Sequence, residues 1–309
     1  MIAVRDIAYV RYQVEDLDAQ EQFLHDFGML PHVRTADTLQ MATYKGGYPA
    51  YIAQRGPKKA LGIGLQVASL DDLKRVATHF NSDISENTEL GTGWVLTLQD
   101  PDGLRVDLLH AGDVIAPQTA RPPLLLNNAE QRPRLGKTNR IDIQPSHVMR
   151  LGHVVLKTVN FAAMFSFYQD LLGFRVSDSY FAEAPENTVA TFMHCGLGDE
   201  FTDHHTVALI NMGAEEPAFD HCAFEVLDWD DVACGSQFLT QKQYNHSWGI
   251  GRHVQGSQIF DYWLDPAGNK IEHWTDGDLV NDTTPVTHEP LSLDGLSQWA
   301  PPLSPEFLA

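Results

Sequence analysis

The sequence predicts an α+β protein made of two copies of one strand-and-helix pattern. Three motifs recur in the same order in both halves of the 309-residue chain. They are an apolar helix end before a glycine (23–28 and 167–173), a strand followed by an acidic helix start (64–73 and 223–232), and an Asp-Pro-x-Gly turn leading into a strand (100–107 and 265–272). Ordered repeats of this kind indicate a duplicated domain.

The first half follows the order strand, helix and three strands. Residues 2–14 alternate between polar and apolar side chains, which predicts a strand. A helix is expected from Asp16 to Phe27, because Asp16 or Asp18 can cap its start and Gly28 follows its end. Further strands are expected at 40–44, 51–53 and 61–67, a second helix at 69–80, and a hairpin of strands 93–99 and 104–109.

The second half repeats this order. Strand 151–158 is followed by a helix from Asn160 to Leu172, and later strands are expected at 223–226, 258–264 and 270–274. The tight turn at 265–268 joins the last two strands, so Tyr262 and Glu272 should point into one space. Phe181–Asp203 is longer than its first-half counterpart, and we expect a loop there that covers the functional site.

Composition divides the chain into four parts. Residues 114–148 are rich in proline and weakly periodic, which is typical of a linker on the surface. We therefore expect a first domain at 1–115, a linker at 116–148, a second domain at 149–280 and a loosely structured tail at 281–309. The tail carries apolar side chains that can dock it, namely Leu291, Leu293, Leu296 and Trp299.

Charge and cysteine content exclude several classes of function. The formal net charge of −20 argues against nucleic acids and anionic membranes as partners, because phosphate binding needs clustered Lys and Arg. No apolar stretch is long enough to cross a bilayer, and the three cysteines fit no CxxC metal spacing. These features predict a cytoplasmic protein without structural disulfides. Fourteen histidines direct the search toward a metal site.

The two halves differ at three positions that can bind a metal. The second half has His153, His221 and Glu272 where the first has Tyr9, Gly62 and Asp107. Because the fold should place similar demands on both copies, residues that differ are candidates for function. Substitution of Asp107 is accordingly expected to leave both metal and activity unchanged.

Two imidazoles and one carboxylate form the facial ligand set of non-haem Fe(II) oxygenases. Such a set leaves three of six coordination positions for a chelating substrate and dioxygen. A structural zinc site would instead have four protein ligands, usually with short spacings between them. The three candidates are far apart in the sequence, which favours the open site.

The second half resembles the catalytic domain of the type I extradiol ring-cleaving dioxygenases, in the vicinal oxygen chelate superfamily. The matching motifs are Gly152-His153, His204-His205-Thr206, the strand start at His221, Gly251-Arg252-His253, Tyr262, the turn 265–268 and Glu272. The resemblance implies two tandem glyoxalase/bleomycin-resistance-like domains built from paired βαβββ modules. It also implies a first domain without metal ligands and a homo-oligomer.

The resemblance further implies the reaction, which is O2-dependent cleavage of a catecholic ring in aromatic-compound catabolism. His153, His221 and Glu272 would hold Fe(II), and Mn(II) accepts the same ligands. His205 would be the acid–base histidine, although His204 competes for that assignment. Tyr262 and His253 would hydrogen-bond the substrate oxygen that stays deprotonated. The expected substrate contacts are Val155, Phe192 and His204.

One departure and two alternatives accompany this interpretation. Asp261 precedes the tyrosine where the family usually has an apolar residue, which bears on substrate specificity. The first alternative is a metal-dependent lyase or isomerase of the glyoxalase type. Such enzymes usually draw metal ligands from both halves, and Tyr9 and Gly62 are poor ligands. The second alternative is a metal-free small-molecule binding protein, in which His205 would have no role. His194, His246 and His273 are expected to be structural or rim residues.

Overall fold

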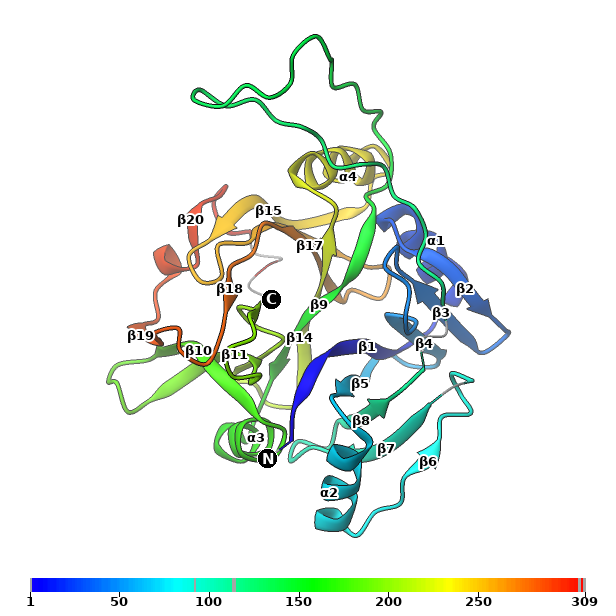
Figure 1. The fold of residues 1–309 in the computed structure, drawn as a ribbon, viewed down its shortest axis with the longest axis vertical. Helices are drawn as coiled ribbons and strands as arrows, with labels where there is room; N and C mark the ends of the chain where they lie inside the picture. The colour runs from blue at the N-terminus through cyan, green and yellow to red at the C-terminus, as the bar shows by residue number, and fades with distance from the viewer. Residues whose placement is uncertain (1, 92, 113–114, 305–306, 308–309) are drawn as a thin grey trace.

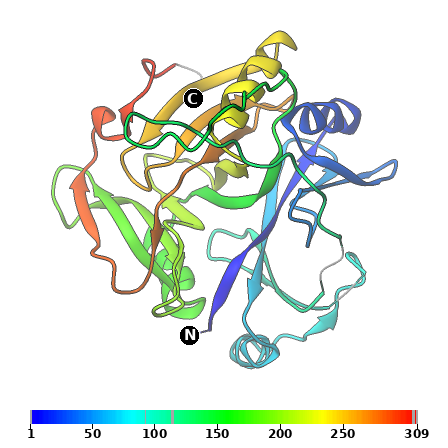
Figure 2. The ribbon, with the colours of Figure 1, turned by 45° about the horizontal axis from the view of Figure 1, so that its top comes forward.

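A computed structural model describes residues 2–91, 93–112, 115–304 and 307. Two large β-sheets follow the two halves of the repeat and lie side by side (Figures 1 and 2). Segment 116–147 has no regular secondary structure and runs past α4 (Trp229–Gln241) as an extended excursion from the body (Figure 1). Within the described ranges, no helix is long and apolar enough to cross a membrane.

The described residues of the first half form two helices and an eight-stranded sheet. Its elements are β1 (Val4–Val14), α1 (Leu17–Phe27), β2 (Leu30–Arg34), β3 (Thr38–Ala42), β4 (Tyr51–Arg55), β5 (Lys59–Val67), α2 (Leu70–Phe80), β6 (Ser85–Glu86), β7 (Trp94–Gln99) and β8 (Arg105–His110). The sheet order is β2-β3-β4-β1-β5-β8-β7-β6.

The second half contains a ten-stranded sheet and continues into the tail. Its elements are β9 (Val148–Lys157), α3 (Phe161–Ser166), the π-helix η1 (Phe167–Leu171), β10 (Phe174–Phe181), β11 (Thr188–Cys195), β12 (Thr202–Asp203), β13 (Val207–Ile210), β14 (Ala218–Val226), α4, β15 (Asn245–His253), β16 (Ile259–Leu264), β17 (Lys270–Thr275), β18 (Leu279–Val280), β19 (Thr287–Pro290), η2 (Leu293–Gly295) and β20 (Ser297–Trp299).

The sheets repeat one order, which confirms the predicted α+β fold of paired βαβββ modules. Between β19 and β20 at its ends, the second sheet reads β10-β11-β13-β9-β14-β17-β16-β15 and matches the first strand by strand. Register confirms the alignment of the halves. His153 and Tyr9 pair with equivalent residues, Ala223 and Gly64, while His221 and Gly62 pair with Lys270 and Arg105.

Helix α1 begins and ends as predicted. The Asp16 side chain accepts hydrogen bonds from two backbone N–H groups of the first turn, and Gly28 takes a left-handed conformation with φ of 110°. A side chain at Gly28 would also collide with the carbonyl of Ser146, so this position requires glycine. The short strand β2 after it was not predicted.

The helix predicted from Asn160 to Leu172 is present, but its second part is π-helical: Asn160 is the N-cap residue of α3, and η1 follows α3 without a break. One expectation for the second half is wrong. The loop predicted at Phe181–Asp203 contains β11, which lies between β10 and β13 inside the sheet. Residues 188–195 pair with strands on both edges, and this tertiary pairing overrides the local loop signal. The tail is also more ordered than expected, because β19 and β20 extend the sheet.

The two halves share one hydrophobic core. The aromatic ring of Phe27 stacks on His273, with ring centroids 3.6 Å apart, and the His273 Nε2 atom lies 2.7 Å from the Phe27 carbonyl oxygen. Burial lowers the pKa of His273 to about 3, so the ring is neutral. This contact holds strand β17 of the second sheet against the first half.

In the first half, Asp107 is buried within a hydrogen-bonded cluster. Its carboxylate accepts bonds from Tyr9 Oη at 2.9 Å, Thr97 Oγ1 at 2.6 Å, Arg105 Nε at 2.8 Å and Arg11 Nε at 3.3 Å. Arg11 is buried as well and also binds Glu89. The first half therefore neutralises its buried carboxylate with guanidinium groups.

Asp107→Ala should lower the free energy of unfolding by about 1–3 kcal/mol, because it leaves the buried Tyr9 and Thr97 hydroxyls without their acceptor, while Arg11 keeps its pair with Glu89. Urea titration of the variant measures this change, and the exposed Asp83→Ala provides the control. Asp107→Ala is still expected to leave metal content and activity unchanged, because the bonding partners of Asp107 lie in the first half. Equal stability of the two variants would contradict the structural role.

Candidate metal centre

Three adjacent strands bring His153, His221 and Glu272 together. Ala223 of β14 pairs with His153 of β9 on one side and with Glu272 of β17 on the other. His221 lies two residues before Ala223 and so shares its face of the sheet. The small side chain of Ala223 leaves the space between the three polar groups open.

The three side chains meet in one buried cluster. One potential ligand atom from each lies within 4.8 Å of the others. The Nε2 atoms of His153 and His221 are 3.3 and 3.4 Å from Glu272 Oε2. All three residues are buried, and Glu272 has no exposed surface.

The donor set fits a divalent cation. Neither carboxylate oxygen of Glu272 has a hydrogen-bond partner of normal geometry among the described residues. A buried charge without partners is costly, and a metal ion would remove that cost. Two imidazoles and one carboxylate are also the ligands that Fe(II), Mn(II) and Zn(II) accept.

The electrostatics keep Glu272 and His153 in their metal-binding forms. Burial alone would raise the pKa of Glu272, but the adjacent imidazoles of His153 and His221 outweigh it and hold that pKa far below its ordinary value. Burial lowers the pKa of His153. The carboxylate is therefore ionised and His153 neutral, as coordination requires. Burial would lower the pKa of His221, but its hydrogen bonds to Asp220 and Glu272 outweigh burial and raise that pKa, so His221 gives up its proton when a metal binds.

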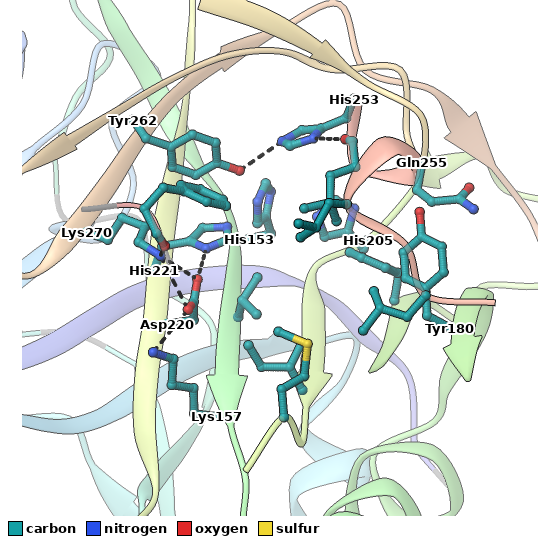
Figure 3. A pocket seen from close by; sticks show the side chains of 18 of the residues that line it. His153, Lys157, Tyr180, His205, Asp220, His221, His253, Gln255, Tyr262 and Lys270 are labelled. Carbon is teal, nitrogen blue, oxygen red and sulfur yellow. Dashed lines mark hydrogen bonds and ion pairs between the residues drawn. The ribbon is translucent and has the colours of Figure 1, made fainter. Parts of the chain in front are cut away.

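His221 is oriented by Asp220, a residue that sequence reasoning missed. Asp220 Oδ2 lies 2.7 Å from His221 Nδ1, and it also faces Lys157 and Lys270 (Figure 3). Adjacent strand residues normally point to opposite faces, but the register of β14 against β9 shifts by one residue here. This bulge places Asp220 beside His221, where its carboxylate fixes the ring with Nε2 toward the cluster.

Tyr262 and His253 form a hydrogen-bonded pair above the cluster (Figure 3). Tyr262 pairs directly with Glu272 in the sheet, as the turn predicted. The Tyr262 hydroxyl lies 2.8 Å from His253 Nε2, while His253 Nδ1 lies 2.9 Å from the Leu296 carbonyl. Because burial lowers the pKa of His253, the neutral ring donates from Nδ1 and accepts from Tyr262. The Tyr262 oxygen keeps its lone pairs for a ligand.

His205 lies next to the candidate ligands, and His204 does not. The His205 ring is 4.1 Å from the His153 ring, centroid to centroid, and it lines the cavity. Burial, together with His153, lowers the pKa of His205 well below its ordinary value. His204 is also buried but is absent from the cavity wall, so its predicted substrate contact is not seen.

A cavity of about 370 Å³ opens on this cluster. Val155 and Phe192 line it, as expected. Apolar residues that sequence reasoning did not place in the wall are Tyr180, Ile210, Met212, Leu291, Leu293, Leu296 and Phe307. The leucines come from the tail, whose apolar side chains the sequence had marked only for docking.

Several polar residues have structural partners instead. Asp261, the departure from the family pattern, is buried and absent from the cavity wall. It binds His246 Nε2 and Trp263 Nε1, both at 2.7 Å. His194 binds Ser177, and His273 binds the first half as described. The predicted structural roles of these histidines are consistent with these contacts.

Comparisons with known proteins agree with this geometry. Residues 150–273 match the Glyoxalase/Bleomycin resistance protein/Dioxygenase superfamily. The chain is 30% identical to metapyrocatechase 2 of Cupriavidus necator, over 99% of this chain and 91% of that protein. It is 24% identical to an iron-dependent extradiol dioxygenase of Rhodococcus jostii, over 93% of this chain and 94% of that protein.

Two solved structures share the fold at low sequence identity. The Mn(II)-bound glyoxalase from Novosphingobium aromaticivorans has a TM-score of 0.78 at 24% identity, covering 100% of this chain and 95% of its own. The 2,3-dioxygenase LapB from Pseudomonas sp. KL28 has a TM-score of 0.77 at 18% identity, covering 94% and 98%. Together with the full-length match to metapyrocatechase 2, these findings show that the chain belongs to the extradiol ring-cleaving dioxygenases of the vicinal oxygen chelate superfamily.

Proposed function

We propose that this enzyme cleaves a catecholic ring beside its two hydroxyl groups, using O2 and an Fe(II) ion held by His153, His221 and Glu272. The observation that carries the proposal is one buried, three-ligand cluster at the base of a mainly apolar cavity. Homo-oligomeric assembly and a cytoplasmic location stay predictions from the sequence.

Fe(II) is the proposed metal because the ligand set is that of non-haem Fe(II) oxygenases. The relative from Rhodococcus jostii is named as iron-dependent, which favours the same choice. Mn(II) accepts these ligand types too, and the glyoxalase of similar fold is Mn(II)-bound. When bound, the metal would supply a Lewis acid and a template on which the two oxygens of a catechol and O2 are held together.

The surrounding residues would bind and orient the ring. The Tyr262 oxygen can accept a hydrogen bond from a catechol hydroxyl, since its own proton is donated to His253. His205 presents its second ring nitrogen to the cavity, where it can take a proton from the substrate and return it later. Exclusion of water by the tail leucines strengthens both interactions.

The cavity wall favours a catechol with an apolar substituent. Its volume of about 370 Å³ falls in the ordinary range of small-molecule sites, roughly 300–1,000 Å³, and Phe192, Leu293 and Phe307 lie along it. The two lysines in the wall, Lys157 and Lys270, share the single carboxylate of Asp220, and Lys270 Nζ also donates to the Phe307 carbonyl.

Each of His153→Ala, His221→Ala and Glu272→Ala should lose most of the bound iron, because each removes one ligand from a three-ligand site. His32→Ala, at an exposed position, is the matched control. Iron content is measured after reconstitution, with circular dichroism to show that the variants fold. Folded variants with full iron content would contradict the assignment of these ligands.

Oxygen uptake and product spectra test the reaction itself. The iron-loaded protein should consume one O2 per ring and form a yellow product of the 2-hydroxymuconic semialdehyde type from a panel of substituted catechols. Alkyl- or aryl-substituted rings should have a higher kcat/KM than carboxylated ones. A colourless muconic acid, or no oxygen uptake with any catechol, would contradict the proposal and favour the glyoxalase-type alternative.

A further inference from the structure

A chain of hydrogen bonds runs from strand β10, next to the edge strand β19 of the second sheet, to His205. Asp178 Oδ2 lies 2.7 Å from His204 Nε2, and His204 Nδ1 lies 3.1 Å from His205 Nδ1. All three residues are buried. His205 Nε2 has no hydrogen-bond partner in the described part of the chain, and the ring lines the cavity.

The direction of these bonds follows from Asp178. Its other oxygen, Oδ1, accepts from the backbone N–H and the hydroxyl of Thr287 on β19. Burial would raise the pKa of Asp178, but the bonds from His204 and Thr287 outweigh it, so the carboxylate is ionised and can only accept.

The proton on each ring can therefore be assigned. A His204 ring that carries one proton donates it from Nε2 to Asp178, which leaves a lone pair on Nδ1. That lone pair accepts from His205 Nδ1–H. His205 then presents the lone pair of Nε2, and not an N–H, to the cavity.

We propose that Asp178 and His204 are positioning residues, which hold His205 in the tautomer and orientation that make its Nε2 atom a proton acceptor at the substrate. This inference rests on the proposed function, in which His205 moves a proton. It reassigns His204 from a substrate contact to a support. It also gives the C-terminal tail a role, since Thr287 in the tail holds the carboxylate of Asp178 at the start of the hydrogen-bond chain.

Asp178→Asn tests the direction of the chain. The Thr287 backbone N–H can only donate, so the amide oxygen of Asn will face Thr287 and its NH2 group will face His204. His204 must then accept at Nε2 and donate from Nδ1. His205 is left with a lone pair on Nδ1 and a proton on Nε2, which is the reverse of the native arrangement.

Nitrogen-15 NMR of the histidine rings detects this reversal directly. The full chain is loaded with Zn(II), a diamagnetic ion that accepts the same ligand types. Signals of His205 are those missing from His205→Ala. Asp178→Asn should move the His205 proton from Nδ1 to Nε2. In the iron-loaded enzyme, kcat should fall roughly 10- to 100-fold, while iron content and anaerobic catechol affinity stay within twofold.

A second pair of variants decides the case if Asp178→Asn does not fold. His204→Asn keeps an acceptor oxygen near the place of Nδ1 and should preserve the His205 tautomer. His204→Leu removes the acceptor and should lose both the tautomer and most of kcat. Thr287→Ser retains both bonds to Asp178 and is the control expected to match the wild type.

Two results would overturn the inference. One is an Asp178→Asn variant with native His205 signals and native kcat. The other is equal behaviour of His204→Asn and His204→Leu. If the wild type itself consumes no O2 with any catechol, the proposed function fails, while the NMR result still decides whether Asp178 and His204 set the tautomer.

Discussion

The structure depends on how the negative charge of one buried carboxylate, that of Glu272, is balanced. Glu272 lies in the centre of the second sheet with no exposed surface and without a hydrogen-bond partner of normal geometry in the described ranges. Isolated burial of such a charge is strongly unfavourable. The arrangement is reasonable only if a cation completes it, and the two imidazole Nε2 atoms beside Oε2 are placed to share that cation. The neighbouring residue His273 then fixes this strand against the first half.

Each half buries a carboxylate at the same position of its sheet, and the two halves balance that charge in different ways. Asp107 occupies the position equivalent to Glu272, but Arg11 and Arg105 provide its countercharge. Gly62 occupies the position of His221, and a side chain there would collide with the carbonyl of Arg105. One fold thus holds a buried carboxylate with guanidinium groups in one copy and with a ligand set for a metal in the other. The two copies pack together through one core and the contact of Phe27 with His273.

Much of the fold could be predicted from the sequence because its signals are local. Asp16 and Gly28 mark the ends of a helix by backbone chemistry alone. The ligands could be proposed because strand register keeps repeat-related positions equivalent. The role of Asp220 could not be proposed, since a β-bulge places its side chain beside that of His221, whereas adjacent strand residues normally point to opposite faces of the sheet. The strand at 188–195 and the tail leucines in the cavity wall depend on tertiary pairing, which local pattern does not encode.

The central claim is that one metal binds in the second half and none in the first. Anomalous X-ray diffraction from crystals of the iron-loaded protein, collected on both sides of the iron edge, tests it most directly. The account predicts one iron peak per chain, bonded to His153, His221 and Glu272, and no peak beside Asp107. A peak in the first half, or a peak in the second half that lacks any of these three ligands, would contradict it.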